Sequence, residues 1–486
     1  MSASVKKSTY SLAYVIKIIV MITLMFGIGM LPPFGEISEV GMKVLGTFIG
    51  LLFGWSCLGI ILPCLTGFVA LSFSGVGTAS EITTGCFGSE VVILLVAMYA
   101  IIDVLDKSGV NDYLVNRLLS IKALQGHPWV FSYIIILACY LSGIIVGGFV
   151  AMLLIWGIIY KIAKIMDLKP YAPYPTCLMI GTTIAGAMSS VVFPFLATAL
   201  FLGSSYTAMS GTPIDYAKFM VFCIPGALFT FLVFILVMRF VFKINLDTLK
   251  NADIRTIVGE EKVVATKKQK TILALFGVLM VLMLLPSFLS QESGIYQILS
   301  SLSSTGKVLL LYAVMTIVIM DGDPLMNVGK SLKNAVAWEM VIMVGFISQL
   351  AIYVASDACG IKATLASYIA PFVGNASGVA FAILILAVCM IATNFMNNGP
   401  VAIIMMSLAI SMSSTVDANI TAICMGCILF SQVAYATPIA SPFAAMLFSN
   451  SEWIRPKDIY KYGGISTVIL IVFCIIFTVI WGEIVF

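Results

Sequence analysis

The stretch that decides the fold is residues 379–412, VAFAILILAVCMIATNFMNNGPVAIIMMSLAISM. It is apolar and longer than the ~20 residues that cross a bilayer as one helix, yet polar residues and a proline interrupt it at 393–400. A single tilted helix accommodates the length but not the interruption. Two short helices that enter and leave on the same side fit better, because irregular backbone at membrane depth must face protein or a polar cavity. The sequence therefore predicts a re-entrant hairpin.

A second segment of this kind, 131–160, is interrupted at 142–148, and we interpret it as another re-entrant hairpin. The other apolar runs are each close to the length of one span. They predict eleven crossings, at 13–31, 41–55, 58–73, 91–105, 176–201, 219–242, 271–288, 308–320, 340–354, 420–448 and 466–481.

Composition sets the class of protein. Of the 486 residues, 61% are hydrophobic and 10% charged, with a mean hydropathy of +1.11, which leaves too little polar surface for water-soluble domains. We expect an all-α polytopic membrane protein, not a nucleic-acid-binding module or a secreted disulfide scaffold. The single histidine, His127, lies in a polar stretch, so no histidine metal site or Ser/His relay can form within the membrane. We expect no enzyme activity and no cofactor.

Charge placement predicts the orientation. With a cytoplasmic N-terminus, 21 of the 26 Lys and Arg residues fall in cytoplasmic loops and four fall outside, a strong positive-inside asymmetry. The C-terminus is then outside, and the plasma or inner membrane is the expected location. Lys6 and Lys7, which precede the first span, are among the cytoplasmic residues. The basic stretch 243–270 is predicted to be a solvated cytoplasmic linker between the two halves, because no aromatic residue interleaves it as in a nucleic-acid arm.

The chain contains a colinear internal repeat. EVVI at 90–93 resembles EMVI at 339–342, and GFVA at 148–151 resembles GPVA at 399–402. The predicted division is an N-terminal helix (1–40), a first repeat (41–242, hairpin 131–160), the linker (243–270) and a second repeat (271–486, hairpin 379–412). Each repeat holds an odd number of crossings, so the two lie inverted across the bilayer. Inverted repeats with broken helices are typical of secondary transporters.

Small polar residues gather at four interruptions, 142–148, 187–194, 393–400 and 436–442. Hydroxyls and amides beside freed carbonyls suit a desolvated alkali cation, and a helix that starts at Pro400 as its first residue points its amide end at an anion. The runs without any Asp, Glu, Lys or Arg are 131–160, 171–214, 363–416 and 418–451. A proton relay on buried carboxylates therefore has no candidate there, and sodium is the expected coupling ion.

Structural roles remain open for the same residues. Asn397 and Asn398 have the alternative of capping a helix or bonding between helices. The serines at 189–190 could instead pack helices together, and the glycines at 147–148 could instead form a tight hairpin turn.

The motifs TNFMNNGPVA (393–402), ATPIASP (436–442) and IRPKD (454–458) resemble the divalent anion sodium symporter family of the ion transporter superfamily. The resemblance covers most of the chain and is more specific in the second half. It implies a scaffold domain that carries a homodimer interface, and a transport domain with both hairpins that moves as an elevator.

In that family a Ser-Asn-Thr triplet at each hairpin tip and a Thr-Pro pair in each broken helix bind carboxylate and sodium. The resemblance implies a substrate-binding set of Gly147, Gly148, Ser189, Ser190, Asn397, Asn398, Gly399, Thr437 and Pro438. It implies a sodium-binding set of Ser142, Val146, Gly147, Met188, Thr393, Met396, Asn398 and Ala436. The first tip departs most from the family, because Val146, Gly147 and Gly148 stand where the triplet is expected.

The expected function is cation-coupled, sodium-driven secondary transport of a small organic anion, a di- or monocarboxylate, by alternating access. The expected partners are this substrate, Na⁺, the lipid bilayer and a second copy of the chain, with no nucleic acid. The alternatives are an exporter or exchanger of an inorganic oxyanion such as arsenite or sulfate, a sodium/proton antiporter, against which the acid-free core argues, and a channel-like conductance.

Overall fold

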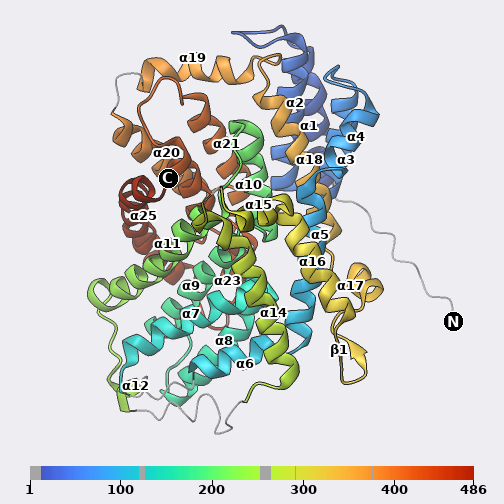
Figure 1. Ribbon diagram of the computed structural model, residues 1–486. Helices are drawn as coiled ribbons and strands as arrows, with labels where there is room; N and C mark the ends of the chain where they lie inside the picture. Colours follow the sequence, from blue (N-terminus) through green and yellow to red (C-terminus); the bar gives the residue numbers. More distant parts are fainter. Residues whose placement is uncertain (1–11, 120–125, 252–263, 291, 374–376) are drawn as a thin grey trace, which may run out of the picture.

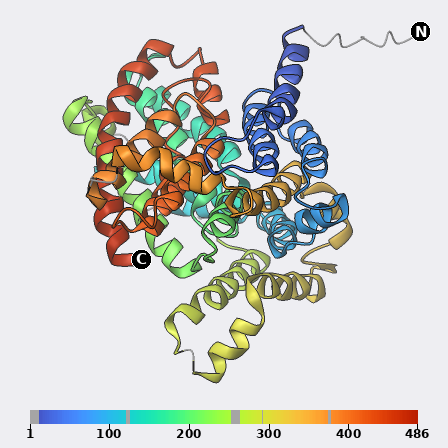
Figure 2. The same cartoon turned by 90° about the horizontal axis from the view of Figure 1, so that it is seen from above.

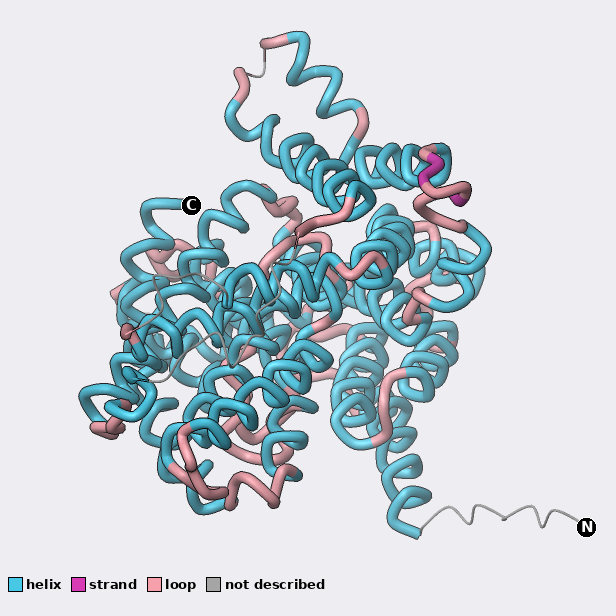
Figure 3. Tube along the Cα trace, turned by 90° about the horizontal axis from the view of Figure 1, so that it is seen from below, coloured by secondary structure: helices cyan, strands magenta, loops and turns pink. Residues whose placement is uncertain are grey.

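The computed structural model describes residues 12–119, 126–251, 264–290, 292–373 and 377–486. These residues are almost entirely helical (Figure 3), and their one strand pair is β1 (Ile319–Met320) antiparallel to β2 (Asp323–Pro324). Six of the described helices are long and apolar enough to cross a membrane, or up to eight if each of two bent pairs is one span. The all-helical class is therefore confirmed, whereas the total of eleven crossings stays a prediction.

The first half of the chain forms helices at each predicted span. In order these are α1 (Leu12–Ile22), η1 (Thr23–Gly27), η2 (Ile28–Met30), α2 (Glu39–Cys57), α3 (Ile61–Ser72), α4 (Ala79–Phe87), α5 (Glu90–Lys107), α6 (Val110–Leu119), α7 (Pro128–Val146), α8 (Gly148–Ile165), α9 (Pro173–Met188), η4 (Ser189–Val191), α10 (Ala197–Ser210), α11 (Tyr216–Leu236), η5 (Val237–Val241) and α12 (Asp247–Asn251).

The second half continues in the same way. Its helices are α14 (Lys267–Leu284), η6 (Leu285–Phe288), α15 (Gly294–Ser301), α16 (Ser303–Ile317), α17 (Val328–Asn334), α18 (Trp338–Ala355), α19 (Ile361–Val373), α20 (Gly378–Ala392), α21 (Asn398–Ser411), α22 (Ile420–Phe430), α23 (Pro442–Ser449), α24 (Pro456–Asp458), η7 (Ile459–Gly463) and α25 (Gly464–Val485). Short polar side chains cap several starts, as Ser377 does for α20 and Asn419 for α22, because they accept from amides that lack a helical partner.

The first hairpin is α7 and α8, which meet at a single residue. Gly147 has φ +85°, a conformation that favours glycine, and it turns the chain between the two limbs. The limbs have 19 and 18 residues, longer than the short helices expected. Two end effects extend them: Pro128 is tolerated as the first residue of α7, where its missing N–H costs nothing, and Lys164 in the last turn favours the carboxyl end of α8.

The second hairpin, α20 and α21, fits the expectation of two short helices, with 15 and 14 residues. Its tip is the five-residue turn 393–397. One detail of the expectation is wrong, because α21 starts at Asn398 and Pro400 is its third residue, not its first. The stronger start signal is Asn397, which caps the helix, and the third position also lacks a helical N–H partner, so proline is tolerated there.

Both predicted broken helices are interrupted in the structure. The helix α9 ends at Met188, η4 adds three residues, and α10 resumes at Ala197 after an irregular stretch with Pro194. The helix α22 ends at Phe430, and α23 begins at Pro442 after irregular backbone over 431–441. Pro194 and Pro438 lie within the two irregular stretches, where a residue without a backbone N–H disfavours a helix.

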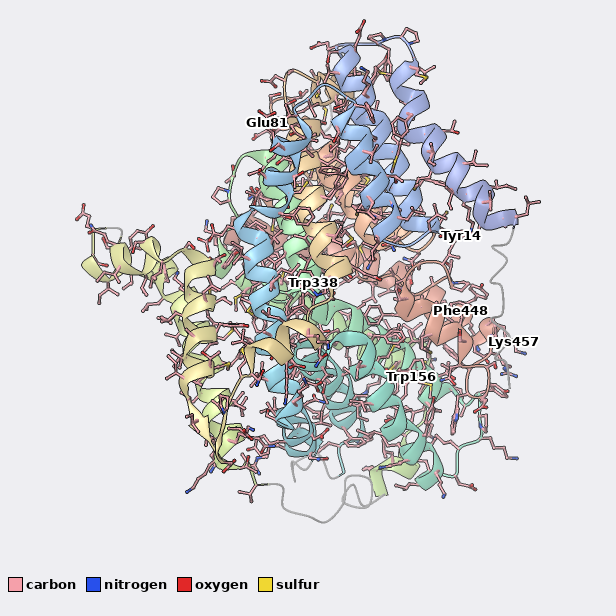
Figure 4. All side chains as sticks on the ribbon, turned by 90° about the vertical axis from the view of Figure 1, so that its right-hand side faces the viewer. Tyr14, Glu81, Trp156, Trp338, Phe448 and Lys457 are labelled. Atoms are coloured by element: carbon pink, nitrogen blue, oxygen red, sulfur yellow. The ribbon has the colours of Figure 1, made fainter. Side chains whose placement is uncertain are left out.

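The second part of each broken helix, α10 or α23, packs against the hairpin of the other half of the chain. In Figure 1 the first hairpin lies low with α9 and α23, while the second lies high with α10, as two inverted copies would place them. The ring of Phe149 in α8 meets Phe443 in α23 edge-on at 6.0 Å. Figure 4 shows the end of α23, at Phe448, on the same side of the molecule as Trp156 of α8. Each hairpin is thus packed against the second limb of the other half's broken helix.

Two further regions surround this core. The helices α14, α15 and α16 project from the bundle, as Figure 2 shows from above. The helix α17, with Lys330 and Lys333, lies in the lower half of Figure 1 together with α6 and α12, and α19 lies at the top. The predicted orientation, the domain boundaries and the repeat division stay predictions. Lys6 and Lys7, and 252–263 of the linker, lie outside the described residues.

Candidate functional site

Asn394 is the centre of the second hairpin tip. Its side chain is 3% exposed, and its amide nitrogen donates to the carbonyls of Met390 (2.8 Å) and Val433 (3.1 Å). Its amide oxygen accepts from the backbone N–H groups of Tyr435 (3.1 Å) and Ala436 (2.9 Å). A side-chain amide has four such positions, and all four are used. Asn394 therefore joins the hairpin to the irregular segment of the broken helix. The sequence marked it as polar but did not place it in the site.

Two threonines extend this connection. Thr393 Oγ1 donates to the carbonyl of Ser431 at 2.7 Å, and Thr437 Oγ1 donates to the carbonyl of Asn394. A hydroxyl that gives its proton to a carbonyl keeps its lone pairs for another partner. The structure thus brings together Thr393, Thr437 and Ala436, three residues of the predicted site.

A third link was not foreseen. Asn398 Nδ2 donates to Gln432 Oε1 at 2.7 Å, and Gln432 Nε2 donates to Ser431 Oγ at 3.2 Å. Gln432 is 2% exposed. The sequence signal for Gln432 is an amide side chain within the uncharged apolar run 418–451. In the structure it lies two residues after the end of α22. An uncharged buried amide needs a partner, and Asn398 is that partner.

Asn397 has the structural role that the sequence left open. Its side-chain oxygen accepts from the N–H of Gly399 at 3.2 Å and caps α21. Gly399 itself is buried, and a Cβ there would lie 3.0 Å from the ring of Phe201 in α10. Its lack of a side chain therefore lets the hairpin approach α10 closely.

Apolar side chains form a rim around the second tip. Phe395, Met396 and Ile439 are 60%, 45% and 69% exposed. Pro438 is also exposed, beside the half-buried Thr437. Met396 turns its side chain outward, so its backbone carbonyl is the group it can offer a cation. The tip is thus an uncharged polar patch inside an apolar rim.

The first hairpin tip is held by backbone contact. A Cβ on Gly148 would overlap the carbonyl oxygen of Gly186 and lie 2.9 Å from Ser189 Oγ, and one on Gly143 would lie 2.7 Å from Ser189 Cβ. Ser189 Oγ donates to Gly186 O at 2.7 Å, within its own helix. The glycines let α7 and α8 meet the end of α9 at the distance of two backbones. Gly186 was not predicted.

The remaining serines of the first half differ in their hydrogen bonds. Ser190 Oγ donates to the carbonyl of Ala187 at 2.7 Å, the local bond that the packing alternative expects. Ser142 Oγ is buried and has no hydrogen-bond partner among the described residues. Such orphaned hydroxyls are rare in folded proteins. Of the other predicted residues, Met188 is fully buried, Val146 half-buried and Gly147 exposed. Ser142 is thus the hydroxyl of this tip that has no hydrogen-bond partner among the described residues.

Neither tip contains an Asp, Glu, Lys, Arg or His residue. Across the part of the chain that the structure describes, no group of three or more His, Cys, Asp or Glu residues is placed to hold a metal ion. Charge at these tips must come from helix ends, carbonyls and hydroxyls. Such groups can bind an alkali cation or an anion without gaining or losing a proton themselves.

Residues 49–427 match the family model CitMHS, described as citrate transporter, and this span runs from α2 into α22 and includes both hairpins. The chain belongs to the CitMHS citrate transporter family. It is therefore an integral membrane protein with a transport role, as the sequence predicted. The more specific assignment to the divalent anion sodium symporter family stays a prediction.

Solved structures with a similar fold support the architecture. One is the YdaH transporter of Alcanivorax borkumensis, 12% identical, with 97% of this chain and 98% of that chain covered and a TM-score of 0.55. Another is Neisseria gonorrhoeae MtrF, from a class of antimetabolite efflux pumps, 11% identical, with 98% and 96% covered and a TM-score of 0.56. No curated protein matches the chain by sequence. At these identities the likeness shows the fold alone.

Proposed function

We propose that this CitMHS family member is a sodium-coupled secondary transporter of a small carboxylate. The observation that carries the proposal is the uncharged polar connection at the second tip, where Thr393, Asn394, Asn398 and Thr437 join α20 and α21 to the break after α22. A break of this kind at membrane depth provides carbonyls for a cation and a helix amide end for an anion.

The choice of sodium follows from what the tips contain. Thr393 and Thr437 keep hydroxyl lone pairs, and Ser142 in the first tip has an unpaired hydroxyl. Sodium prefers such oxygen ligands, whereas proton coupling requires a group that titrates. The tips contain no carboxylate or histidine for that task. The same reasoning disfavours a sodium/proton antiporter.

The choice of a carboxylate rests on the family and on the tip. The family description names citrate, so citrate is the first substrate to test, followed by di- and monocarboxylates. Since neither tip has an arginine or lysine, the negative charge of the substrate must be balanced by bound cations and by the amide end of α21. A substrate with several carboxylates then requires sodium to be bound beside it.

The proposed mechanism is alternating access by two inverted repeats. The helix α10 of the first half packs against the second hairpin, and α23 of the second half packs against α9. Because of these contacts we treat the two hairpins as parts of one unit. We propose that this unit moves as an elevator against a scaffold that includes α14–α16, in a homodimer in the plasma or inner membrane, with the N-terminus inside and the C-terminus outside. In that arrangement the tips reach the two sides of the membrane in turn.

The test is uptake of labelled citrate and succinate into proteoliposomes, driven by a sodium gradient or by a proton gradient. We expect uptake with sodium alone and none with the proton gradient alone. The matched variants are Asn398→Ala, which removes a site amide and should abolish uptake, and Lys333→Gln, an exposed residue of α17, which should not change it. Uptake that needs protons and ignores sodium contradicts the coupling. Transport of arsenite or sulfate in place of carboxylates supports the oxyanion exporter or exchanger.

A further inference from the structure

A pocket lies at the base of the first hairpin, far along α7 from the tip. Its volume is about 500 Å³, and it is bounded by the start of α7, the end of α11 with η5, and α12. It is lined by Gly126, His127, Pro128, Trp129, Val130, Arg239, Ile244, Asn245, Leu246, Asp247 and Lys250. We call it the α7 base pocket. Figure 1 shows α12 at the lower edge of the molecule, on the face predicted to be cytoplasmic.

The lining has an excess of positive charge. Arg239 and Lys250 are exposed and, among the described residues, neither forms an ion pair with a carboxylate. Asp247 is the acidic residue of the lining, and its backbone N–H donates to Asn245 Oδ1 at 2.7 Å. The guanidinium of Arg239 lies 5.2 Å from the ring of Phe240 and 5.9 Å from the ring of Trp129, which also lines the pocket. Among the described residues of the lining, two cations therefore face one carboxylate, in a volume that admits a small ligand.

The backbone adds to this charge. The helix α7 opens on Pro128, and the side chain of His127 does not cap it. Its first amide groups therefore lack a side-chain acceptor, and 19 residues of aligned peptide dipoles point their positive end at the pocket. Together with Arg239 and Lys250, this arrangement suits a compact anion with several oxygens.

The corresponding position of the second hairpin has the opposite character. A smaller pocket, about 160 Å³, lies at the start of α20 and the end of α25. It is lined by Asp417 and Glu483 and by no Lys or Arg. The start of α20 is capped by Ser377. The basic lining is thus specific to the first hairpin, and repeat geometry alone does not explain it.

The surroundings place the α7 base pocket at a lipid boundary. Val130 in its lining, and Phe240 and Val241 just after the lining residue Arg239, are exposed apolar residues. Basic pockets between membrane helices on the cytoplasmic side bind the phosphate groups of lipids. We propose that the α7 base pocket binds a phosphate group, supplied by the headgroup of an anionic phospholipid or by a soluble phosphate monoester, and that Arg239 and Lys250 contact its oxygens.

The test measures binding to the purified, delipidated full-length protein. The probes are phosphatidylglycerol, phosphatidylcholine and glycerol phosphate, and the readouts are the shift in unfolding temperature and the number of lipids retained in native mass spectrometry. The variant is Arg239→Gln with Lys250→Gln. The matched control is Lys330→Gln with Lys333→Gln, two exposed lysines of α17 in the same half of the molecule. Lys250→Gln alone, at an exposed position of α12, serves if the double variant does not fold.

We expect phosphatidylglycerol to bind and phosphatidylcholine not to bind. Removal of each cation should weaken binding about fivefold, and removal of both about 25-fold, with no change in the control. Binding of glycerol phosphate as well assigns the site to soluble phosphate monoesters, and binding of phosphatidylglycerol alone assigns it to lipid. Equal binding by the double variant and the wild-type protein, or no binding of any probe, overturns the proposal. Neither result depends on carboxylate uptake, so it is distinct from a failure of the proposed transport function.

Discussion

The two hairpin tips, one in each half of the chain, are built by different physical means. The second tip is joined to its broken helix by side-chain hydrogen bonds, chiefly from Asn394. The first tip is joined by close backbone contact between Gly148 and Gly186. The difference teaches that two hairpins of similar design can be held to their broken helices by different contacts. The second tip is a satisfied polar network, and the first leaves a hydroxyl, Ser142 Oγ, unpaired.

The largest expected effect is at the second tip. Asn394→Ala removes four hydrogen bonds at a buried position and leaves two backbone N–H groups and two carbonyls without this partner. Each buried polar group left unpaired costs about 1–3 kcal/mol, so we expect the four together to cost at least about 4 kcal/mol, and we expect no transport. The measurements are the free energy of unfolding and proteoliposome uptake.

The matched control is Asn397→Ala, three residues along the same tip. It removes a helix cap, and we expect a loss of about 1 kcal/mol. Equal losses for the two asparagines contradict the central role of Asn394.

Gly148→Ala tests the first tip. The added Cβ overlaps the carbonyl of Gly186, and neither backbone can withdraw without moving a helix. We expect a loss of about 1–3 kcal/mol and reduced uptake, because overpacking separates the hairpin from α9. The control is Gly157→Ala in the same limb, where a Cβ meets nothing within 4 Å. That change should stabilise by about 0.5–1 kcal/mol. A harmless Gly148→Ala shows that close contact does not hold this tip.

The sequence predicted the positions of the two hairpin tips better than the hydrogen bonds that hold them. The interruptions at 142–148 and 393–400 were visible because Gly, Asn and Pro stop an apolar run. The roles of Asn394 and Gln432 were not, because their partners lie about forty and thirty-four residues away in the chain, and only the fold brings them together. The length of the first hairpin was missed for a related reason. Helix ends at Pro128 and Ile165 depend on local end effects that an apolar run does not reveal.

The bond between Asn398 and Gln432 offers a sharper test within the second tip. Gln432→Leu keeps the bulk of the side chain but removes its bonds to Asn398 and Ser431, and we expect a loss of about 1–2 kcal/mol. The check is a double-mutant cycle with Asn398→Leu, read from unfolding free energies. If the two losses simply add, the residues are not coupled and the assignment of Gln432 to the site is wrong.

The smallest change in stability is expected for Ser142→Ala. Because the hydroxyl has no described partner, its removal without sodium should change the free energy of unfolding by less than about 1 kcal/mol, in either direction. In sodium the wild-type protein should be stabilised more than the variant, since a ligand that binds the folded state stabilises it. The measurement is thermal unfolding in sodium and in potassium. The same sodium shift in both proteins removes Ser142 from the cation site.

The most direct measurement is the dissociation constant of citrate, determined by calorimetry on the purified protein in sodium and in potassium. Each is measured at two pH values, both high enough for citrate to be fully ionised. Because the tips carry oxygens and amides but no titratable side chain, we predict binding in sodium, much weaker binding in potassium, and the same affinity at both pH values. Binding that is indifferent to sodium but changes with pH contradicts the account.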